Sequence, residues 1–364
     1  MEPVEPIRFF LPGPTYVPQA ARQAMTQPVV AHRSPSFQET YATVAEGLQR
    51  VFRTAGEVVV ATGSSTLMME SAIVSTVERK VLHLTGGAFS ERWLEISRCL
   101  GKAADQVAVP WGQGIDPELV RQALRRGSYD VVTVVHNETS TGVMNPLEEI
   151  ARVVREESDA LLLVDAVSSL GGAPVEVDGW GLDVVVTGSQ KALAVPPGLA
   201  LVSLSARALE RCRALPHRGF YTDLLRYADK HRGGGTITTP AVSVVYALEH
   251  QLARIGAEGL EERWRRHRQL ARQVATWARR AGLTLAAADG VRSATVTCLE
   301  APAGWTPRQL LGRLAEDGWT VAGGYGQWKP KTFRIGHMGE VRATDLEPLL
   351  AALDQLLADP VWSA

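Results

Sequence analysis

The residue best suited to covalent chemistry in this sequence is Lys191. Only six of the 38 Lys and Arg residues are lysine, and Lys191 is the one that closely follows a short apolar run, Val184–Val186. An amine differs from a guanidinium because it can lose its proton and form a Schiff base. The other five lysines lie beside charged or loop-forming residues, which is typical of a surface. We predict that Lys191 is catalytic; the alternative is a lysine held in a structural ion pair.

Asp165 is a second candidate. It comes directly after the aliphatic run Leu161–Val164, where a carboxylate needs a cationic or N–H partner. Asp165 and Lys191 follow successive predicted strands, so they could contact opposite ends of one small ligand.

Three further segments offer groups for such a ligand. Thr62-Gly63-Ser64-Ser65-Thr66 leads from a predicted strand into a predicted helix, where free N–H groups favour an anion such as phosphate. A simple helix cap is the alternative. Phe89, in a glycine-rich loop, either stacks on a planar ligand or belongs to the core. Residues 136–142 (His-Asn-Glu-Thr-Ser-Thr-Gly) are so polar that burying them requires a polar ligand or a hydrogen-bond network.

The runs that precede these candidates predict the strands of one sheet. Unbroken apolar runs are typical of strands buried on both faces, and helical patterns separate most of them. This alternation favours an α/β fold with a mostly parallel sheet, which binds ligands at the carboxyl ends of its strands. The predicted strands are Val58–Ala61, Val81–Leu84, Val131–Val135, Leu161–Val164, Val184–Val186 and Leu199–Leu204, and the predicted helices are Leu67–Val77, Arg92–Leu100, Pro117–Arg126 and Leu147–Glu156.

The pattern changes near Glu258. Apolar residues from Leu260 to Ala281 recur at spacings of three and four, which predicts one long helix. The arginines between positions 263 and 268 adjoin acidic residues, so they are interpreted as a solvated face rather than a polyanion site. Strands at 293–299 and 332–335 and helices at 307–317 and 346–357 follow. We expect an N-terminal arm (1–15), a large ligand-binding domain (16–257) and a small C-terminal α+β domain (258–364).

Composition excludes several classes of protein. With 364 residues, a net charge of −1 and 45% hydrophobic residues, the chain is neither disordered nor charged for nucleic acid or an anionic membrane. Three scattered cysteines, expected to be buried thiols, do not form a disulfide framework or a metal site. No P-loop and no Gly-x-Gly-x-x-Gly after a strand is present, which disfavours nucleoside triphosphates and dinucleotides. Without a signal peptide at Met-Glu-Pro-Val-Glu-Pro or an apolar stretch of ~18 residues, we expect a soluble cytoplasmic protein.

The separate candidates together match one cofactor, pyridoxal 5'-phosphate (PLP). PLP needs a lysine for its aldehyde, a carboxylate for its ring nitrogen, a phosphate seat at a helix N-terminus and a flat group against its ring. Lys191, Asp165, residues 62–66 and Phe89 would supply these four contacts.

The motifs around these residues resemble those of the class V aminotransferases, and in particular the alanine–glyoxylate and serine–pyruvate (serine–glyoxylate) branch. The resemblance runs from about Phe9 to Leu357. The motifs that carry it are Phe10-Leu11-Pro12-Gly13-Pro14-Thr15, Asn137-Glu138-Thr139-Ser140-Thr141-Gly142-Val143, Val164-Asp165-Ala166-Val167-Ser168-Ser169, Gly188-Ser189-Gln190-Lys191-Ala192 with Pro196-Pro197-Gly198, and Phe333-Arg334-Ile335-Gly336.

This resemblance implies a role for each matching residue. Lys191 would form the Schiff base, and Asp165 would hold the ring nitrogen with Val167 packed under the ring and Phe89 on its other face. Ser64, Ser65, Thr66 and Gln190 would contact the phosphate, although relatives often have Gly-His at the second and third of these positions. Thr139 would lie near the ring hydroxyl, and Arg334 would bind the substrate carboxylate. The implied fold is the fold type I homodimer with shared active sites, where Thr239 reaches the neighbouring subunit's phosphate.

The implied reaction moves an amino group from alanine or serine to glyoxylate or pyruvate. Three alternatives remain open: a phosphoserine or aspartate aminotransferase, a PLP-dependent lyase such as a cysteine desulfurase, and a hydrolase using Ser189 with Lys191. A scaffold without a cofactor is a fourth. The basic pairs His32-Arg33, His217-Arg218 and His231-Arg232 could admit a second anionic group, or they could be surface or interface contacts.

Overall fold

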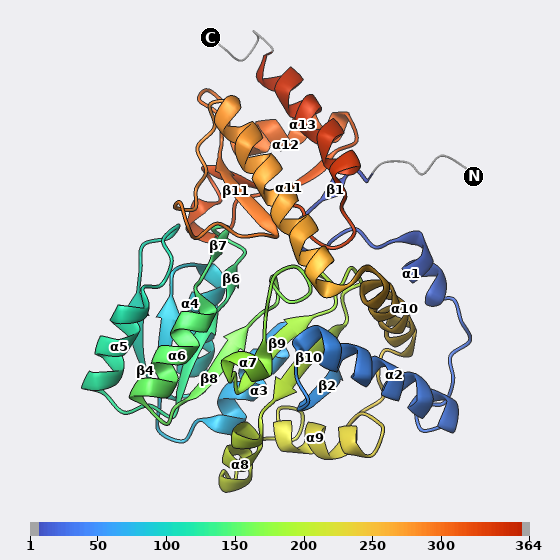
Figure 1. Cartoon of the computed structure of the whole chain (residues 1–364), viewed down its shortest axis with the longest axis vertical. Coiled ribbons are helices and arrows are strands. Elements are labelled where there is room, and N and C mark those ends of the chain that lie inside the picture. The colour runs from blue at the N-terminus through green and yellow to red at the C-terminus, as the bar shows by residue number, and fades with distance from the viewer. Residues whose placement is uncertain (1–6, 359–364) are drawn as a thin grey trace.

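The computed structural model describes residues 7–358, which form two main β-sheets, each with its own helices (Figure 1). Residues 1–6, which include part of the predicted arm and the segment judged not to be a signal peptide, lie outside the described residues. Residues 359–364, at the end of the predicted C-terminal domain, do so as well.

The larger sheet has seven strands in the order β2-β10-β9-β8-β5-β3-β4. β10 is antiparallel to both of its neighbours, β2 and β9, while the other neighbouring strands pair in parallel. Only residues 189–198 separate β9 from β10, which is too short for a crossover helix, so the chain reverses direction. The predicted α/β fold with a mostly parallel sheet is confirmed. The strands are β2 (Glu57–Thr62), β3 (Lys80–Thr85), β4 (Ala103–Ala108), β5 (Val131–Val135), β8 (Leu161–Asp165), β9 (Val184–Gly188) and β10 (Leu199–Leu204).

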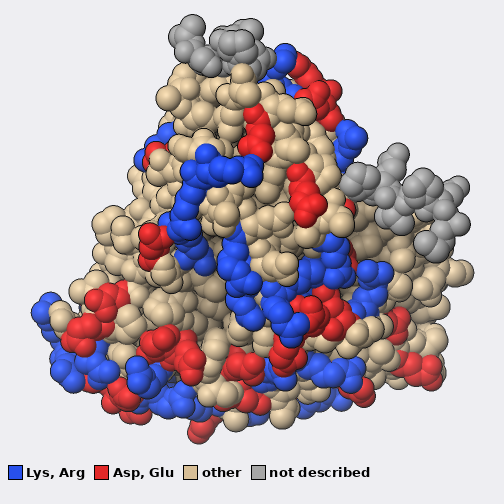
Figure 2. Space-filling view, turned by 45° about the horizontal axis from the view of Figure 1, so that its top comes forward, with Lys and Arg blue, Asp and Glu red and all other residues tan. Residues whose placement is uncertain are grey.

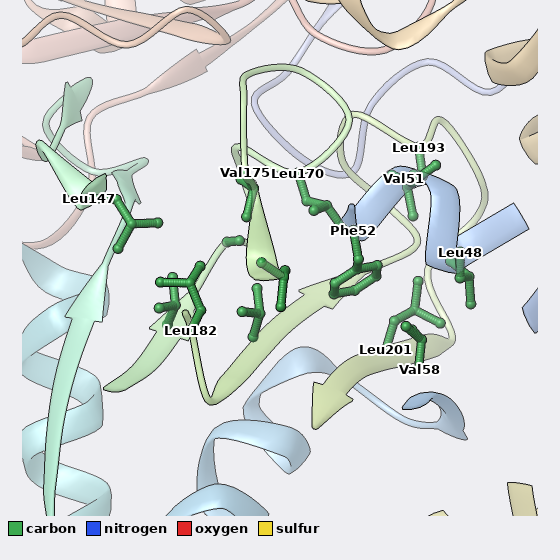
Figure 3. Close-up of a cluster of buried hydrophobic side chains, with 14 of the residues drawn as sticks. Leu48, Val51, Phe52, Val58, Leu147, Leu170, Val175, Leu182, Leu193 and Leu201 are labelled. Atoms are coloured by element: carbon green, nitrogen blue, oxygen red, sulfur yellow. The ribbon is translucent and has the colours of Figure 1, made fainter. Parts of the chain in front are cut away.

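Helices cover both faces of this sheet. Along β2, Val58 and Val60 belong to one core while Val59 and Ala61 belong to the other, because successive side chains of a strand point to opposite faces. In Figure 3, Leu48 and Phe52 of α2 point toward the strands of the first core. The first core also includes residues of α5, α6 and α10, and the second includes residues of α3, α4, α8 and α9. These helices are α2 (Pro35–Phe52), α3 (Ser65–Thr76), α4 (Ala88–Cys99), α5 (Pro117–Arg126), α6 (Leu147–Glu157), α8 (Ala206–Ala214), α9 (Leu224–Arg232) and α10 (Val242–Glu258).

The predicted strands and helices of this region all form within a few residues of their expected bounds. β4 was not predicted, because it is an edge strand whose residues are partly exposed and so has no apolar run. The expectation of three buried thiols is wrong for Cys99, which ends α4 and is exposed, whereas Cys212 and Cys298 are buried.

The second sheet has four strands in the order β1-β12-β13-β11 and packs against the long helix α11 and two shorter helices. β1, close to the described N-terminal end, pairs in parallel with β12, so Phe10 joins the core of this sheet. The elements are β1 (Phe9–Phe10), α11 (Leu260–Arg280), β11 (Val296–Glu300), α12 (Pro307–Glu316), β12 (Thr320–Gly323), β13 (Thr332–Gly336) and α13 (Ala343–Leu357); short elements elsewhere are α1 (Gln19–Ala24), β6 (Asn137–Glu138), β7 (Val143–Met144), α7 (Val177–Trp180) and the 3₁₀ turn η1 (Gly326–Trp328).

The arginines of α11 correct the interpretation of a solvated face. Arg263 is fully buried and Arg266 is 9% exposed. Arg263 pairs with Glu258 and Glu340 at 2.7 and 2.9 Å, and Arg266 pairs with Glu258 at 2.6 Å. Arg265 is exposed and pairs with Glu262. Figure 2 shows basic side chains gathered across the middle of one face, with acidic ones beside them. Part of the arginine run between positions 263 and 268 therefore belongs to a buried ion-pair network.

None of the helices in the described part of the chain is long and apolar enough to cross a membrane.

Candidate active site

Lys191 lies in the turn after β9, under the N-terminal segment of the chain. Its Nζ donates a hydrogen bond to the carbonyl oxygen of Pro12 at 2.6 Å. A Cβ at Gly13 would lie 2.3 Å from Nζ, so only glycine permits this close approach. Thr15 secures the same segment: its N–H donates to Gln190 O and its Oγ1 donates to Lys191 O, both at 3.0 Å.

The amine of Lys191 is available for chemistry. Within residues 7–358, no carboxylate lies at ion-pair distance from its Nζ, which contradicts the alternative of a structural ion pair. Burial and the nearby guanidinium groups of Arg334 and Arg92 lower the pKa of Lys191 to about 8, against the attraction of Asp165. The unprotonated amine, which a nucleophile requires, is therefore more populated near neutral pH than it is for an ordinary lysine.

Asp165 ends β8, next to β9 in the sheet, and is 4% exposed. Its Oδ1 accepts a hydrogen bond from Val167 N at 2.8 Å. Burial is the largest effect on Asp165 and raises its pKa to about 6. The hydrogen bond from the Val167 N–H and the charge of Lys191 act in the opposite direction, while the charge of Glu138 raises the pKa further. Such a carboxylate is well placed to receive a cationic N–H group, because pairing would offset the cost of burying its charge.

Phe89 is held at the start of α4 by a buried carboxylate, Glu138. The Glu138 side chain accepts hydrogen bonds from Phe89 N and Ser90 N at 3.1 and 3.0 Å, and from Ser140 Oγ at 2.6 Å. A negative charge at a helix N-terminus is favourable because the free N–H groups point at it. A Cβ at Gly87 would lie 2.3 Å from Glu138 Cγ, so glycine leaves the space that this carboxylate occupies. Much of the polar run 136–142 thus satisfies itself through a network.

The segment after β2 has the properties of an anion site rather than of a capped helix. Ser64 is the N-cap residue of α3, yet its side chain makes no capping hydrogen bond. Ser65 is 6% exposed, and its buried Oγ has no hydrogen-bond partner in the described structure. A Cβ at Gly188 would lie 2.3 Å from Ser65 Oγ and 2.6 Å from Gln190 Oε1, so both side chains converge over Gly188. Thr66 follows in the first turn of the helix.

Arg334 reaches the site from β13 of the second sheet and is 8% exposed. Its Nε donates to Gly323 O at 2.9 Å and its Nη1 donates to Thr139 O at 3.2 Å. Within residues 7–358, Arg334 has no acidic partner and its Nη2 has no hydrogen bond. A buried guanidinium without a counter-ion is costly, so this arrangement suits a ligand that carries a carboxylate. Thr139 also forms a hydrogen bond of 2.5 Å between its Oγ1 and Ser168 Oγ.

Comparison with known protein families identifies the family to which this chain belongs. A family model described as Aminotransferase class-V matches residues 19–344. The chain belongs to the class V aminotransferases.

Individual relatives agree with this assignment. An uncharacterized aminotransferase of Methanocaldococcus jannaschii is 40% identical over 357 residues, which cover 96% of this chain and 92% of the relative. The L-aspartate–glyoxylate aminotransferase of Paracoccus denitrificans is 34% identical, and the alignment covers 96% of this chain and 91% of the relative. The crystal structure of an alanine–glyoxylate aminotransferase from Nostoc superposes with a TM-score of 0.90 at 32% identity, covering 98% of this chain and 97% of that one. The protein is a PLP-dependent aminotransferase.

The residues of this aminotransferase fit PLP. The unpartnered Ser65 Oγ and the uncapped start of α3 offer donors to a phosphate. Lys191 offers an amine without an ion pair, and Asp165 offers a buried carboxylate that lacks a cationic partner within ion-pair distance in the described structure. Val167, half-buried, lies two residues after Asp165 and donates its N–H to the Asp165 carboxylate.

Other candidates of the sequence lie apart from this cluster or are bonded elsewhere. Thr239 is exposed and has no hydrogen bond of its own within the described chain, although Ala241 N, two residues later, donates to Thr62 Oγ1. Arg218 pairs with Asp223 at 2.8 Å, and Arg232 pairs with Glu57 and Asp229. Arg218 and Arg232 are therefore engaged by carboxylates of their own chain.

Four residues near the site were not singled out from the sequence. Glu138 lay within the polar run, where nothing distinguished it from its neighbours. Arg92 lies one turn after Phe89 on α4, so helical spacing could have indicated it. Asn137 is 2% exposed, and neither polar atom of its side chain has a partner in the described structure. Tyr325 comes from the second sheet's loop, which no local pattern connects to this edge.

Proposed function

We propose that this aminotransferase moves an amino group from a small L-amino acid, alanine or serine, to a small 2-oxo acid, glyoxylate or pyruvate. The observation that carries the proposal is the buried guanidinium of Arg334, which has no ion pair within residues 7–358 and lowers the pKa of Lys191. A substrate of this reaction always carries a carboxylate next to the reacting carbon. Relatives named for glyoxylate as acceptor support the choice of acceptor.

In this proposal each residue of the cluster has one role. Ser64, Ser65, Thr66 and Gln190 hold the phosphate of PLP, and Asp165 holds its ring nitrogen. Phe89 and Val167 would pack against the two faces of the ring, and Thr139 would lie near the ring hydroxyl. PLP, when bound, supplies an electron sink for the charge left on the substrate when a proton is removed from Cα.

The chain's own residues position the substrate and move that proton. Arg334 binds the α-carboxylate through paired N–H groups, which fixes the orientation of Cα. Lys191 Nζ first holds the cofactor and, once the substrate's amino group has replaced it, acts as the base that removes the Cα proton. Its lowered pKa keeps part of this amine unprotonated near neutral pH. Asp165 stays ionised against the protonated ring nitrogen, because a cation at that position lowers its pKa.

Two alternative chemistries fit the geometry less well. For a Ser–Lys hydrolase, Ser189 Oγ would have to face Lys191, but it donates to Pro196 O at 2.7 Å. For a cysteine desulfurase, a mobile thiol would be needed. Cys298 is instead a buried residue of β11, and burial raises its pKa to about 11, so its thiol stays protonated.

We also propose that two copies share their active sites, with Thr239 of each chain reaching the phosphate of the other. The exposure of Thr239 supports this proposal, since it leaves the side chain free for another chain. Sedimentation of the purified protein at several concentrations tests it. A monomer at micromolar concentration would contradict it.

The central experiment is a panel of amino donors given to the PLP-loaded protein, read from the change in the cofactor's visible absorption. Alanine and serine should convert the bound cofactor to its amine form, and glyoxylate or pyruvate should reverse the change. Lys191→Ala should lose the visible band and catalytic turnover, whereas Lys230→Ala, a change at an exposed lysine of α9, should keep both. Full transamination by Lys191→Ala would refute the proposal.

A further inference from the structure

A second guanidinium without an acidic partner lies beside the first. Arg92 is half-buried on α4, and within residues 7–358 no carboxylate lies at ion-pair distance from it. Its Cζ lies 4.7 Å from the centre of the Phe89 ring, and its Nη2 donates to the hydroxyl of Tyr325 at 3.0 Å. An arginine has five N–H donors, so most of those on Arg92 remain free.

Tyr325 connects the two cations. Its ring stacks on Phe89 with 5.3 Å between ring centres and 17° between planes, and its ring centre lies 5.6 Å from Arg334 Cζ. Arg92 is hydrogen-bonded to the hydroxyl group of Tyr325, and Arg334 lies over the Tyr325 ring. The two guanidinium groups therefore both contact the side chain of Tyr325, so a molecule with two carboxylates could meet both of them.

The charges around the site do not neutralise these cations. Arg92 lies close enough to Asp165 and Lys191 to lower the pKa of both. Asp165 and Glu138 are the acidic groups that act on the same cluster, and Glu138 is already bound to the N–H groups of α4. Because Asp165 is assigned to the cofactor, neither carboxylate remains for Arg92.

We propose that Arg92 binds the side-chain carboxylate of the amino donor, so that the enzyme accepts L-aspartate as well as donors with neutral side chains. This inference rests on the proposed function, in which Arg334 holds the α-carboxylate. Arg92 would be a specificity residue, and Tyr325 would be the positioning residue that holds it through the 3.0 Å hydrogen bond.

The competing interpretation is structural: Arg92 packs on Phe89 and merely keeps that ring in place. The two roles differ in what a substitution changes. Loss of a structural support should lower the activity with every amino donor equally. Loss of a carboxylate ligand should lower the activity only with donors that carry a second carboxylate.

Binding to the PLP-loaded protein separates the two interpretations without turnover. Succinate and butyrate have four carbons each, but only succinate has a second carboxylate. Wild type should bind succinate more tightly, and Arg92→Gln should reduce the ratio of the two affinities about 10- to 100-fold, as expected for charge-assisted hydrogen bonds. Arg92→Lys should keep part of the preference. Arg98→Gln, at an exposed position of the same helix, should keep all of it.

The kinetic arm compares kcat/KM for L-aspartate and L-alanine, each with glyoxylate. Arg92→Gln should lower the aspartate-to-alanine ratio by a similar factor, and Tyr325→Phe should lower it by less. Equal losses for both donors, or an unchanged ratio, would overturn the inference. Wild type that uses alanine but not aspartate would overturn this inference alone, while wild type inactive with every donor would overturn the proposed function and this inference with it.

Discussion

Arg334 and Thr139 are joined by a hydrogen bond of 3.2 Å from Nη1 to the backbone carbonyl, although the two residues are 195 positions apart in sequence. This contact brings the second sheet's unpaired cation to the polar turn that follows β5. It therefore combines residues of both sheets in one site.

Replacing Arg334 with Gln should lower kcat/KM for every amino donor by about 100-fold. The change removes charge-assisted hydrogen bonds to the α-carboxylate, which contribute about 1.5–3 kcal/mol each. Steady-state kinetics with alanine and serine measures the effect. Arg308→Gln, at an exposed arginine of α12, serves as the control, and equal kinetics of the two variants would contradict the assignment.

Asp165→Asn should change stability and activity in opposite directions. Without cofactor, the folded state holds the Asp165 proton more tightly than the unfolded state, because the folded pKa is about 6. Stability therefore falls as pH rises from about 4 to 6, and the ionised group costs up to about 3 kcal/mol above that range.

The asparagine variant avoids this cost. Urea unfolding of the cofactor-free protein should show a gain for Asp165→Asn at pH 8 that shrinks toward pH 4, while transamination falls by orders of magnitude. An equal change in stability at both pH values would show that ionisation of Asp165 is not its cause.

Ser65→Ala should weaken cofactor binding with little effect on the free energy of unfolding. The Ser65 hydroxyl has no hydrogen-bond partner among residues 7–358, so removing it breaks no hydrogen bond within this part of the chain. Losing one hydrogen bond to a phosphate should raise the Kd for PLP about tenfold. Fluorescence titration with PLP measures this, with Ser36→Ala at an exposed position as the control. A large loss of stability with unchanged PLP affinity would assign Ser65 a structural role instead.

Arg263→Met should destabilise the fold by about 1–3 kcal/mol, because the carboxylates of Glu258 and Glu340 each lose one of their arginine partners. Arg263 also donates from Nη2 to Ala192 O at 2.7 Å, so it supports the turn that carries Lys191. Urea unfolding should separate this variant from Arg265→Met, whose arginine is exposed. Similar midpoints for the two variants would show that the buried network is not needed for stability.

Glu258 should make stability sensitive to acid. Burial would raise its pKa, but the ion pairs with Arg266 and Arg263 outweigh burial and lower it to about 2. Its contribution is therefore complete above the unfolded pKa of about 4.3 and is lost as pH falls through 2. Glu258→Gln should be less stable than wild type at pH 7, and the difference should shrink below pH 4. A constant difference across this range would contradict the pairing.

Local patterns in the sequence were sufficient to predict the strands of the large sheet other than β4, and the edge of that sheet where the candidate site lies. Apolar runs such as Leu161–Val164 form strands wherever both faces are buried, and the residue after each run must lie at the carboxyl edge of a parallel sheet. Asp165 and Lys191 could be placed together for this reason alone. The same patterns could not indicate β4, an exposed edge strand, or the burial of Arg263, because burial depends on what packs against a helix.

Tertiary structure alone decided which distant groups complete the site. Pro12, Glu138 and Tyr325 approach Lys191, Phe89 and Arg92 from separate parts of the chain, and no periodicity in one segment encodes a contact with another. Whether an arginine is paired is equally a tertiary property: among the described residues, Arg232 has carboxylates at ion-pair distance and Arg334 has none. Sequence determines which side chains are available, whereas folding determines which charges remain without a partner, and those charges select the ligand.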